Sequence, residues 1–263
     1  MQDLSLEAIR DNKKLTFPIR ESNKSSFIGK IRYWWSLFLA GFLLFFAALP
    51  AMIILQIINR RIKLYSLCVW GTKTWIRGSG IKVKVSGKEN LEENKSYIFI
   101  ANHYSYIDTT ALFAYAGKRI GLIAKKEVLK VPVLGRGMGF INFVAIDRSN
   151  AQRAVETMNK VRETVDSGYS FGIFAEGTRA MPGELLPFKK GAFHVALQTG
   201  AAIIPVAIKN TDYLMGKKTG VLNSGTMEIV LLPVIETKGL SAETDLPELL
   251  RKTREAIAKE LGK

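Results

Sequence analysis

The amino-acid sequence predicts an α/β fold: a mixed, largely parallel sheet flanked by helices and preceded by an N-terminal membrane-embedded helical segment. Two observations support this prediction. From residue 81 onward, short apolar runs alternate with longer amphipathic patterns, as strands and helices do in α/β domains. Before that, no charged residue occurs between Arg32 and Arg60. Such a stretch exceeds the roughly 20 residues with which a helix crosses a bilayer.

The composition indicates a packed core and an anionic partner. The chain has 263 residues, of which 48% are hydrophobic, which favours a packed core over global disorder. Its formal net charge of +15 suits nucleic acid, an anionic lipid surface or small anionic substrates. Cys68 is the only cysteine, which excludes an internal disulfide, and no Cys/His cluster has the spacing of a zinc site. The sequence therefore predicts no metal centre.

The N-terminal third divides into a polar arm, residues 1–30, and a membrane-anchoring helical segment, residues 31–77. The arm is mixed in charge and weakly patterned. The apolar stretch of the segment starts too late, and is too long, for the core of a signal peptide. Aromatic residues stand at one edge of this stretch and basic residues at the other: Tyr33, Trp34 and Trp35, then Arg60, Arg61 and Lys63. Such flanks are typical of the membrane interface.

Pro50 leaves two arrangements open for the membrane segment, because a proline inside a helix kinks or breaks it. One is a single kinked span. The other, which we favour, is a hairpin with one helix up to Leu49 and a second from about Met52 to Ile76. The second arm is amphipathic and contains basic residues, as in helices that lie in the interface. Basic residues flank both ends, so their distribution does not decide the orientation.

Residues 78–263 form the predicted α/β domain, separated from the segment by Gly78-Ser79-Gly80. Most of its predicted strands are continuous apolar runs, as expected where helices cover both faces of a sheet. The first predicted strand, residues 81–85, instead alternates apolar and polar residues and is expected to be half-buried; the others are residues 97–101, 120–124, 141–146, 171–175, 202–208 and 226–233. Helical patterns lie between and after them, at residues 106–117, 149–168, 191–199 and 245–262.

The first candidate site is "NHYSYID", residues 102–108, which follows the strand 97–101. A spacing of five residues, across a turn and into a helix, lets Asp108 fold back toward His103. Such a pair suits general base catalysis, because the carboxylate orients the imidazole and stabilises the imidazolium. The alternative is that Ser105 or Asp108 caps the helix and His103 packs in a turn. The pair alone favours this alternative.

The second candidate site is "EGTR", residues 176–179, which also follows a predicted strand. Gly177 permits a tight turn, and the planar fork of Arg179 suits phosphate or carboxylate. Lys189 and Lys190 add positive charge nearby in the sequence. The alternative is a solvated loop in which Glu176 and Arg179 pair with each other.

A third element joins two strands, since Lys125 ends one and Arg148 follows the next. The glycines between them do not match G-x-G-x-x-G, so a dinucleotide site is not predicted. Ser170 lies in a G-x-S-x-G match, but it follows a helix and precedes a strand, the reverse of a nucleophile elbow. His194 falls within a predicted helix and is interpreted as structural. The sequence therefore offers no protein nucleophile.

Taken together, "NHYSYID", "AKKEVLKVPVLGRG…FVAIDR", "EGTR" and "AIIPVAI", in this order, resemble the glycerolipid acyltransferase family, in particular bacterial 1-acyl-sn-glycerol-3-phosphate acyltransferases. The resemblance covers roughly residues 80 to 210. It implies that residues 78–263 are an acyltransferase domain. The implied reaction moves a fatty acyl chain from an acyl thioester to the free sn-2 hydroxyl of 1-acyl-sn-glycerol-3-phosphate, giving phosphatidic acid without an acyl-enzyme.

The resemblance also implies a role for each site residue. His103 is the general base, Asp108 orients it, and Asn102 supports the motif. Arg179 binds the acceptor phosphate. The remaining phosphate-site residues shape the loop or add contacts: Glu176, Gly177 and Thr178 in the loop, and Lys125 and Arg148 as further contacts. The apolar block "VPVLGRGMGF" is expected to line the acyl-chain groove.

No cofactor or metal is implied; the co-substrate is acyl-CoA or acyl-acyl carrier protein. The expected partners are membrane lipid and lysophosphatidic acid, with no nucleic acid. The expected location is a membrane and, in a bacterium, the inner membrane with the catalytic domain on the cytoplasmic face. Two rivals stay open: an acyltransferase for another lysophospholipid or for glycerol-3-phosphate, and a non-catalytic, membrane-tethered protein that binds anionic lipid.

Overall fold

The computed structural model describes residues 6–18, 26–57, 62–125, 143–146 and 151–263. Within these ranges a seven-stranded sheet has the order β2-β9-β8-β3-β6-β4-β5. All neighbouring strands are parallel except β8 and β9. The strands are β2 Ile81–Ser86, β3 Tyr97–Ala101, β4 Ile120–Lys125, β5 Val144–Ile146, β6 Ser170–Phe174, β8 Ala202–Lys209 and β9 Gly225–Leu231. The predicted mixed, largely parallel sheet and its seven strands are confirmed.

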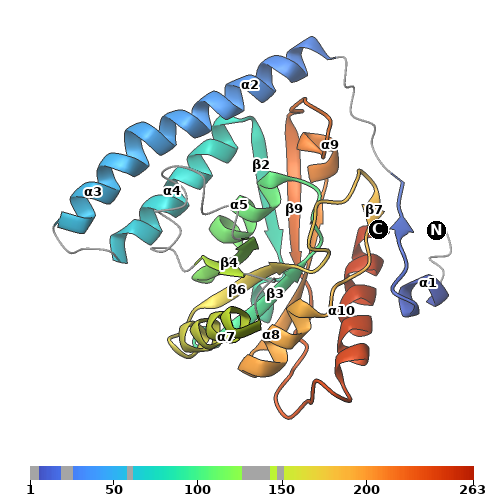
Figure 1. Ribbon diagram of the computed structural model, residues 1–263. Coiled ribbons are helices and arrows are strands. Elements are labelled where there is room, and N and C mark those ends of the chain that lie inside the picture. Colours follow the sequence, from blue (N-terminus) through green and yellow to red (C-terminus); the bar gives the residue numbers. More distant parts are fainter. Residues whose placement is uncertain (1–5, 19–25, 58–61, 126–142, 147–150) are drawn as a thin grey trace.

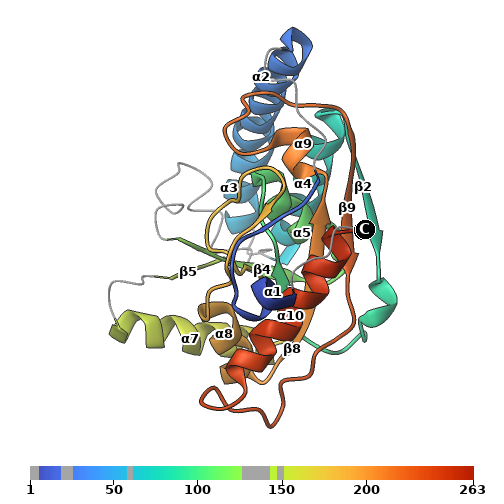
Figure 2. The ribbon, with the colours of Figure 1, turned by 90° about the vertical axis from the view of Figure 1, so that its right-hand side faces the viewer.

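Helices cover both faces of the sheet (Figures 1 and 2). Helices α4 Ile62–Gly78 and α5 Tyr106–Tyr115 lie on one face, and α7 Ala151–Asp166, α8 Gly191–Thr199 and α10 Leu246–Leu261 lie on the other. The central strand β3 shows why its sequence is apolar throughout. Tyr97 and Phe99 belong to the hydrophobic cluster under α4 and α5, whereas Ile98 and Ile100 belong to the cluster on the opposite face.

Part of the N-terminal arm packs against the α/β domain. The arm forms helix α1 Leu6–Arg10 and strand β1 Leu15–Thr16, which pairs antiparallel with β7 Glu184–Leu185. Ile9 and Leu15 are buried. The guanidinium of Arg254, on α10, donates hydrogen bonds to the carbonyls of Ala8, Ile9 and Lys13. The composition of residues 1–30 predicted only a polar arm, and these contacts have no signal in the local sequence.

The predicted membrane segment consists of two antiparallel arms, which favours the hairpin over a single kinked span (Figure 1). The first arm runs through α2 Phe27–Phe42, a π-helical turn, η1 Leu43–Ala48, and α3 Leu49–Ile57; the second is α4. The predicted boundary at Leu49 was therefore wrong. Pro50 is the second residue of α3, next to the wider π-helical turn, where its ring is accommodated and the helix continues.

Polar side chains join the two arms. The hydroxyls of Ser36 and Ser79 lie 2.8 Å apart, and the indole N–H of Trp75 donates to the Ser36 carbonyl at 2.9 Å. The indole N–H of Trp35 donates to the carbonyl of Gly78 at 3.0 Å. The outer face of the first arm is apolar and exposed, including Phe27, Trp34 and Phe46. Within the described residues, one helical stretch, Phe27–Ala51, is long and apolar enough to cross a membrane.

Candidate active site

The two predicted motifs meet at the carboxyl ends of two neighbouring strands. Strands β3 and β6 are parallel neighbours, and Ala101 at the end of β3 pairs with Phe174 at the end of β6. The "NHYSYID" and "EGTR" motifs follow these two strand ends. The carboxyl edge of parallel strands is where α/β proteins collect their ligand sites. The structure therefore brings His103 and the 176–179 loop together.

Asn102 fixes the direction in which the chain leaves β3. Its side chain is fully buried. The Asn102 amide Nδ2 donates to the Ile208 carbonyl at 2.9 Å, and the Ile208 N–H donates to Asn102 Oδ1 at 2.8 Å. The side chain thus continues the pairing of β3 with β8 by one step, in the manner of a backbone pair. We assign Asn102 the task of holding the turn from which His103 projects.

His103 and Asp108 form a close pair. Nδ1 of His103 lies 3.0 Å from Oδ2 of Asp108, whose carboxylate is fully buried, whereas the imidazole is 14% exposed. The backbone N–H groups of Tyr104 and Ser105 donate to the same Oδ2 at 2.7 and 2.8 Å. With Nδ1 donating its proton to the carboxylate, Nε2 is the nitrogen that can accept a proton. The ring stacks on Phe174, with centroids 4.1 Å apart.

The structure confirms that this motif caps a helix. Ser105 is the N-cap of α5, and Asp108 completes a capping box by accepting the N–H of Ser105. The Ser105 hydroxyl accepts the N–H of Ile107 at 3.3 Å and donates to the Met215 carbonyl at 2.7 Å. One carboxylate therefore begins the helix and orients the imidazole. The two interpretations that the sequence set against each other are compatible.

Glu176 holds the backbone of His103 in place. It is almost fully buried, its Oε1 accepts the backbone N–H of His103 at 2.7 Å, and its Oε2 accepts that of Leu186 at 2.9 Å. The backbone N–H of Ala180 donates to the His103 carbonyl at 2.7 Å. The proposed alternative, a solvated loop in which Glu176 pairs with Arg179, was wrong. The carboxylate instead ties the two strand ends together.

Burial raises the pKa of Glu176 from its ordinary value of 4.5 to about 8, despite the two N–H donors, which lower it. A carboxyl with a raised pKa in the folded protein takes up a proton on folding wherever the unfolded chain is ionised. Its contribution to stability therefore falls as pH rises between these two values.

We expect the free energy of unfolding of the wild-type protein in detergent to fall between about pH 5 and pH 8, and to fall less in Glu176→Gln, which does not titrate. Denaturant titrations at several pH values measure this difference. Glu243→Gln, at an exposed position, is the control and should follow the wild type. Equal slopes for wild type and Glu176→Gln would contradict the prediction.

Three cations lie at the 176–179 loop and form what we call the cationic surface: Arg179, Lys189 and Lys217. Gly177 has a φ of +69°, and the side chain of Lys189 lies 3.0 Å from the position that a Cβ would take there. Thr178 is exposed. The guanidinium of Arg179 lies 3.7 Å from the ring centroid of Tyr106, and the Lys217 ammonium donates to the Arg179 carbonyl at 2.5 Å. Within the described residues, none of these three cations forms an ion pair with a carboxylate.

Sequence reasoning missed Tyr106 and Lys217 as parts of this site. Tyr106 occupies an unspecified position of the motif, and only the structure reveals that the residue is 63% exposed. Lys217 follows α9 Thr211–Met215, more than 100 residues from His103 in the chain. The order of the strands in the sheet brings Lys217 to the site, and local sequence patterns do not reveal that order.

Other predicted residues lie elsewhere or outside the described residues. Lys125 ends β4, at the same edge of the sheet, but its side chain lies outside the described part. Arg148 and the "VPVLGRGMGF" block also lie outside it. Ser170 begins β6, is buried, and its hydroxyl accepts the Tyr97 N–H at 3.0 Å, so it is no nucleophile elbow. His194 lies within α8, as predicted.

The chain is similar in sequence to known acyltransferases. Residues 82–209 match the family model "Acyltransferase". The chain is 40% identical to a 1-acyl-sn-glycerol-3-phosphate acyltransferase of Saccharomyces cerevisiae, over 70% of this chain and 62% of the relative. It is 31% identical to the human 1-acyl-sn-glycerol-3-phosphate acyltransferase alpha, over 68% and 63%. It thus spans slightly less than two thirds of the length of these curated relatives.

The fold is also similar to a solved structure. The crystal structure of the 1-acyl-sn-glycerophosphate (LPA) acyltransferase PlsC from Thermotoga maritima superposes with a TM-score of 0.73. The alignment covers 88% of this chain and 95% of that chain at 23% identity, so it bears on the fold alone. The family match and the identity to several named relatives together show that residues 82–209 form a domain of the family described as "Acyltransferase".

Proposed function

We propose that the chain transfers a fatty acyl chain from an acyl thioester to the free sn-2 hydroxyl of 1-acyl-sn-glycerol-3-phosphate, giving phosphatidic acid. The observation that carries the proposal is the His103–Asp108 pair, 3.0 Å apart, next to the cationic surface formed by Arg179, Lys189 and Lys217. The names of the relatives support the same acceptor.

In the proposed reaction, Nε2 of His103 takes the proton of the acceptor hydroxyl as its oxygen attacks the thioester carbonyl carbon. The carbon–sulfur bond then breaks, and the leaving thiolate takes the proton from the imidazolium. Asp108 holds the imidazole by Nδ1 and offsets the positive charge that forms on it. The acyl chain passes directly to the acceptor. The hydrogen bonds of Ser105, the serine beside His103, support this direct transfer. Its hydroxyl donates to the Met215 carbonyl and accepts the N–H of Ile107, so it is occupied in the turn and is not assigned as a nucleophile.

The acceptor phosphate is proposed to bind Arg179, with Lys189 and Lys217 adding charge. Glu176, Gly177 and Thr178 shape this loop, and Lys125 and Arg148 stay predicted as further contacts. The phosphate would lie beside His103, because the backbone of the loop is tied to that of His103 through Glu176 and Ala180. No metal or prosthetic group takes part in the proposal; the donor is acyl-CoA or acyl-acyl carrier protein.

Arg179→Ala is expected to raise the KM for the phosphorylated acceptor about 10- to 100-fold, because a charge-assisted contact to phosphate is lost. The KM for the acyl donor should stay within twofold. Tyr106→Leu should raise the acceptor KM about two- to fivefold through loss of the ring under the guanidinium. Tyr106→Phe, which keeps the ring, is its control. An unchanged acceptor KM in Arg179→Ala would remove Arg179 from the phosphate site.

The exposed apolar face of α2 and η1 is proposed to insert into the membrane and to present the site to a lipid acceptor. In a bacterium this would be the inner membrane, with the α/β domain on the cytoplasmic face.

The experiment that tests the function is a radiolabelled acyl-transfer assay with the purified full chain. Acyl-CoA and acyl-acyl carrier protein serve as donors, and lysophosphatidic acid, other lysophospholipids and glycerol-3-phosphate as acceptors. Labelled phosphatidic acid as the main product supports the proposal. Preference for another acceptor would replace the substrate, and no transfer to any acceptor would overturn the proposed function.

A further inference from the structure

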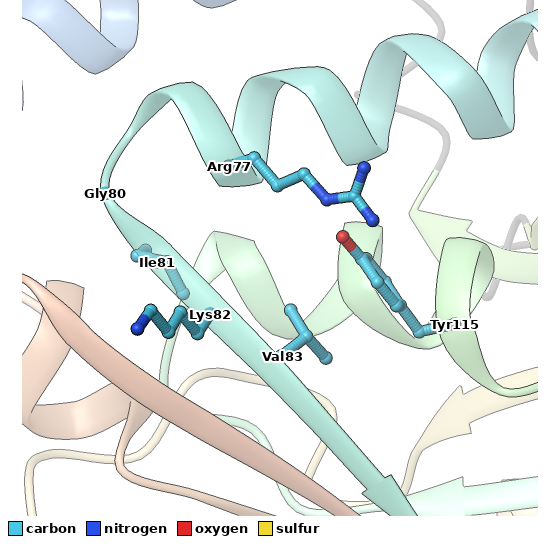
Figure 3. Close-up of a pocket in the computed structure, with 6 residues that line it drawn as sticks. All are labelled: Arg77, Gly80, Ile81, Lys82, Val83 and Tyr115. Atoms are coloured by element: carbon cyan, nitrogen blue, oxygen red, sulfur yellow. The ribbon is translucent and has the colours of Figure 1, made fainter.

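An open groove lies where the second arm of the hairpin, α4, meets β2, the outermost strand of the sheet (Figure 3). Its volume is about 400 Å³. It is lined by Arg77 near the end of α4, by residues 80–83 around the start of β2, and by Tyr115 at the end of α5. None of these residues belongs to the site around His103, so the groove is a separate feature of the surface.

Two cations of α4 converge on the phenol of Tyr115. The guanidinium of Arg77 points toward the Tyr115 hydroxyl (Figure 3). Lys73, four residues earlier on the same helix, places its ammonium 5.2 Å from the centroid of the Tyr115 ring. Lys82 borders the groove on β2, with its ammonium directed away from Arg77 (Figure 3). The groove therefore combines hydrogen-bond donors with positive charge.

Within the part of the chain that the structure describes, no carboxylate forms an ion pair with Lys73 or Arg77. The sequence contains no aspartate or glutamate from Ser22 to Lys88. Among the described residues, Lys95, Lys209 and Arg251 each form an ion pair, but Lys73 and Arg77 do not. Like charges four residues apart on a helix destabilise it slightly. Their placement is thus better suited to binding an external anion than to stabilising the fold.

The position of the groove indicates the source of that anion. The carbonyl of Gly78, next to Arg77, accepts the indole N–H of Trp35. Trp35 and Trp70 are 50% and 53% exposed on the two arms of the hairpin. Exposed tryptophans of membrane proteins gather at the level of the lipid headgroups. A guanidinium and an ammonium at that level face the phosphates of the bilayer.

We propose that Lys73, Arg77 and Tyr115 bind the phosphate of an anionic phospholipid headgroup, at a site separate from the reaction site. The occupant is a membrane lipid and not a soluble anion, because the groove adjoins the apolar hairpin and its exposed tryptophans. The inference rests on the membrane placement proposed above and does not depend on the acyl-transfer reaction.

The test is binding of the full chain to vesicles of phosphatidylcholine with and without phosphatidylglycerol. We expect Arg77→Gln to weaken binding to the anionic vesicles about fivefold and to leave binding to pure phosphatidylcholine unchanged. Tyr115→Phe, which keeps every charge, should weaken the same binding about two- to fivefold through loss of one hydrogen bond. The control is Lys259→Gln, which removes an exposed charge on α10 and should change binding less than twofold.

Acyl transfer to a detergent-dispersed acceptor reports on folding and should be the same in all three variants. The site is wrong if Arg77→Gln and Tyr115→Phe bind anionic vesicles as the wild type does, or if Lys259→Gln loses as much as Arg77→Gln. Saturable displacement of the vesicles by inorganic phosphate at matched ionic strength would assign the groove to a soluble anion instead. Vesicle binding is read without turnover, so failure of the proposed reaction would leave this result interpretable.

Discussion

His103→Ala is expected to lower kcat for acyl transfer by about 10²- to 10⁴-fold, the usual contribution of a positioned general base. Alanine removes the contacts of the imidazole with Asp108 and Phe174, but the contacts that hold the turn are made by the backbone of His103. Its N–H donates to Glu176 and its carbonyl accepts from Ala180. The variant should therefore fold, bind vesicles and bind the acceptor, which separates loss of chemistry from loss of structure.

The matched control is His194→Ala, at the other histidine of the chain, which lies within α8. Acyl-transfer rates at saturating acceptor and donor, together with melting temperatures, compare the two variants. Substantial turnover by His103→Ala would show that His103 is not the base. It would also leave the His–Asp pair with only its role at the start of α5.

Asp108→Asn is expected to lower kcat by a similar factor, about 10²- to 10⁴-fold, although the side chain keeps its shape. Oδ2 of Asp108 accepts three hydrogen bonds, from Tyr104, Ser105 and His103. An amide must keep its oxygen there, which places its NH₂ group at the buried position of Oδ1, where the structure shows no hydrogen-bond partner among the described residues. The amide also lacks the charge that offsets the imidazolium.

Asp245→Asn provides the same change at the start of another helix, α10, and should leave kcat unchanged. Thermal melting separates the capping role of Asp108 from its proposed catalytic role. Should Asp108→Asn melt earlier but turn over at the wild-type rate, the carboxylate would be a helix cap alone.

Local patterns were sufficient to predict the sheet. Each buried strand needs apolar residues on both faces, so runs such as 97–101 stand out against their amphipathic neighbours. The motifs were found for a related reason, since each directly follows such a run. Strand order, by contrast, depends on long-range packing, and the contributions of Tyr106 and Lys217 could not be seen from their neighbours in the chain.

The errors at the N-terminal end have the same origin. The helix break predicted at Pro50 follows from the local cost of a proline, but a π-helical turn and the contacts of α4 offset that cost. The polar arm was predicted from its composition. Its docking depends on Arg254, about 240 residues away, and on the pairing of Leu15 with Leu185.

That docking has a consequence for the order in which the protein matures. The arm is synthesised well before α10, whose Arg254 holds it. The arm pairs with β7, and Leu186 directly follows β7. The carboxylate of Glu176 accepts the backbone N–H groups of both Leu186 and His103, so it links β7 to the turn that carries His103. The hairpin, for which we propose membrane insertion, is thus complete while the ribosome is still making the α/β domain. The loop beside His103 gains its last support only when synthesis has passed Arg254. We expect a chain truncated before α10 to keep its anchor, to expose the arm to protease and to be inactive.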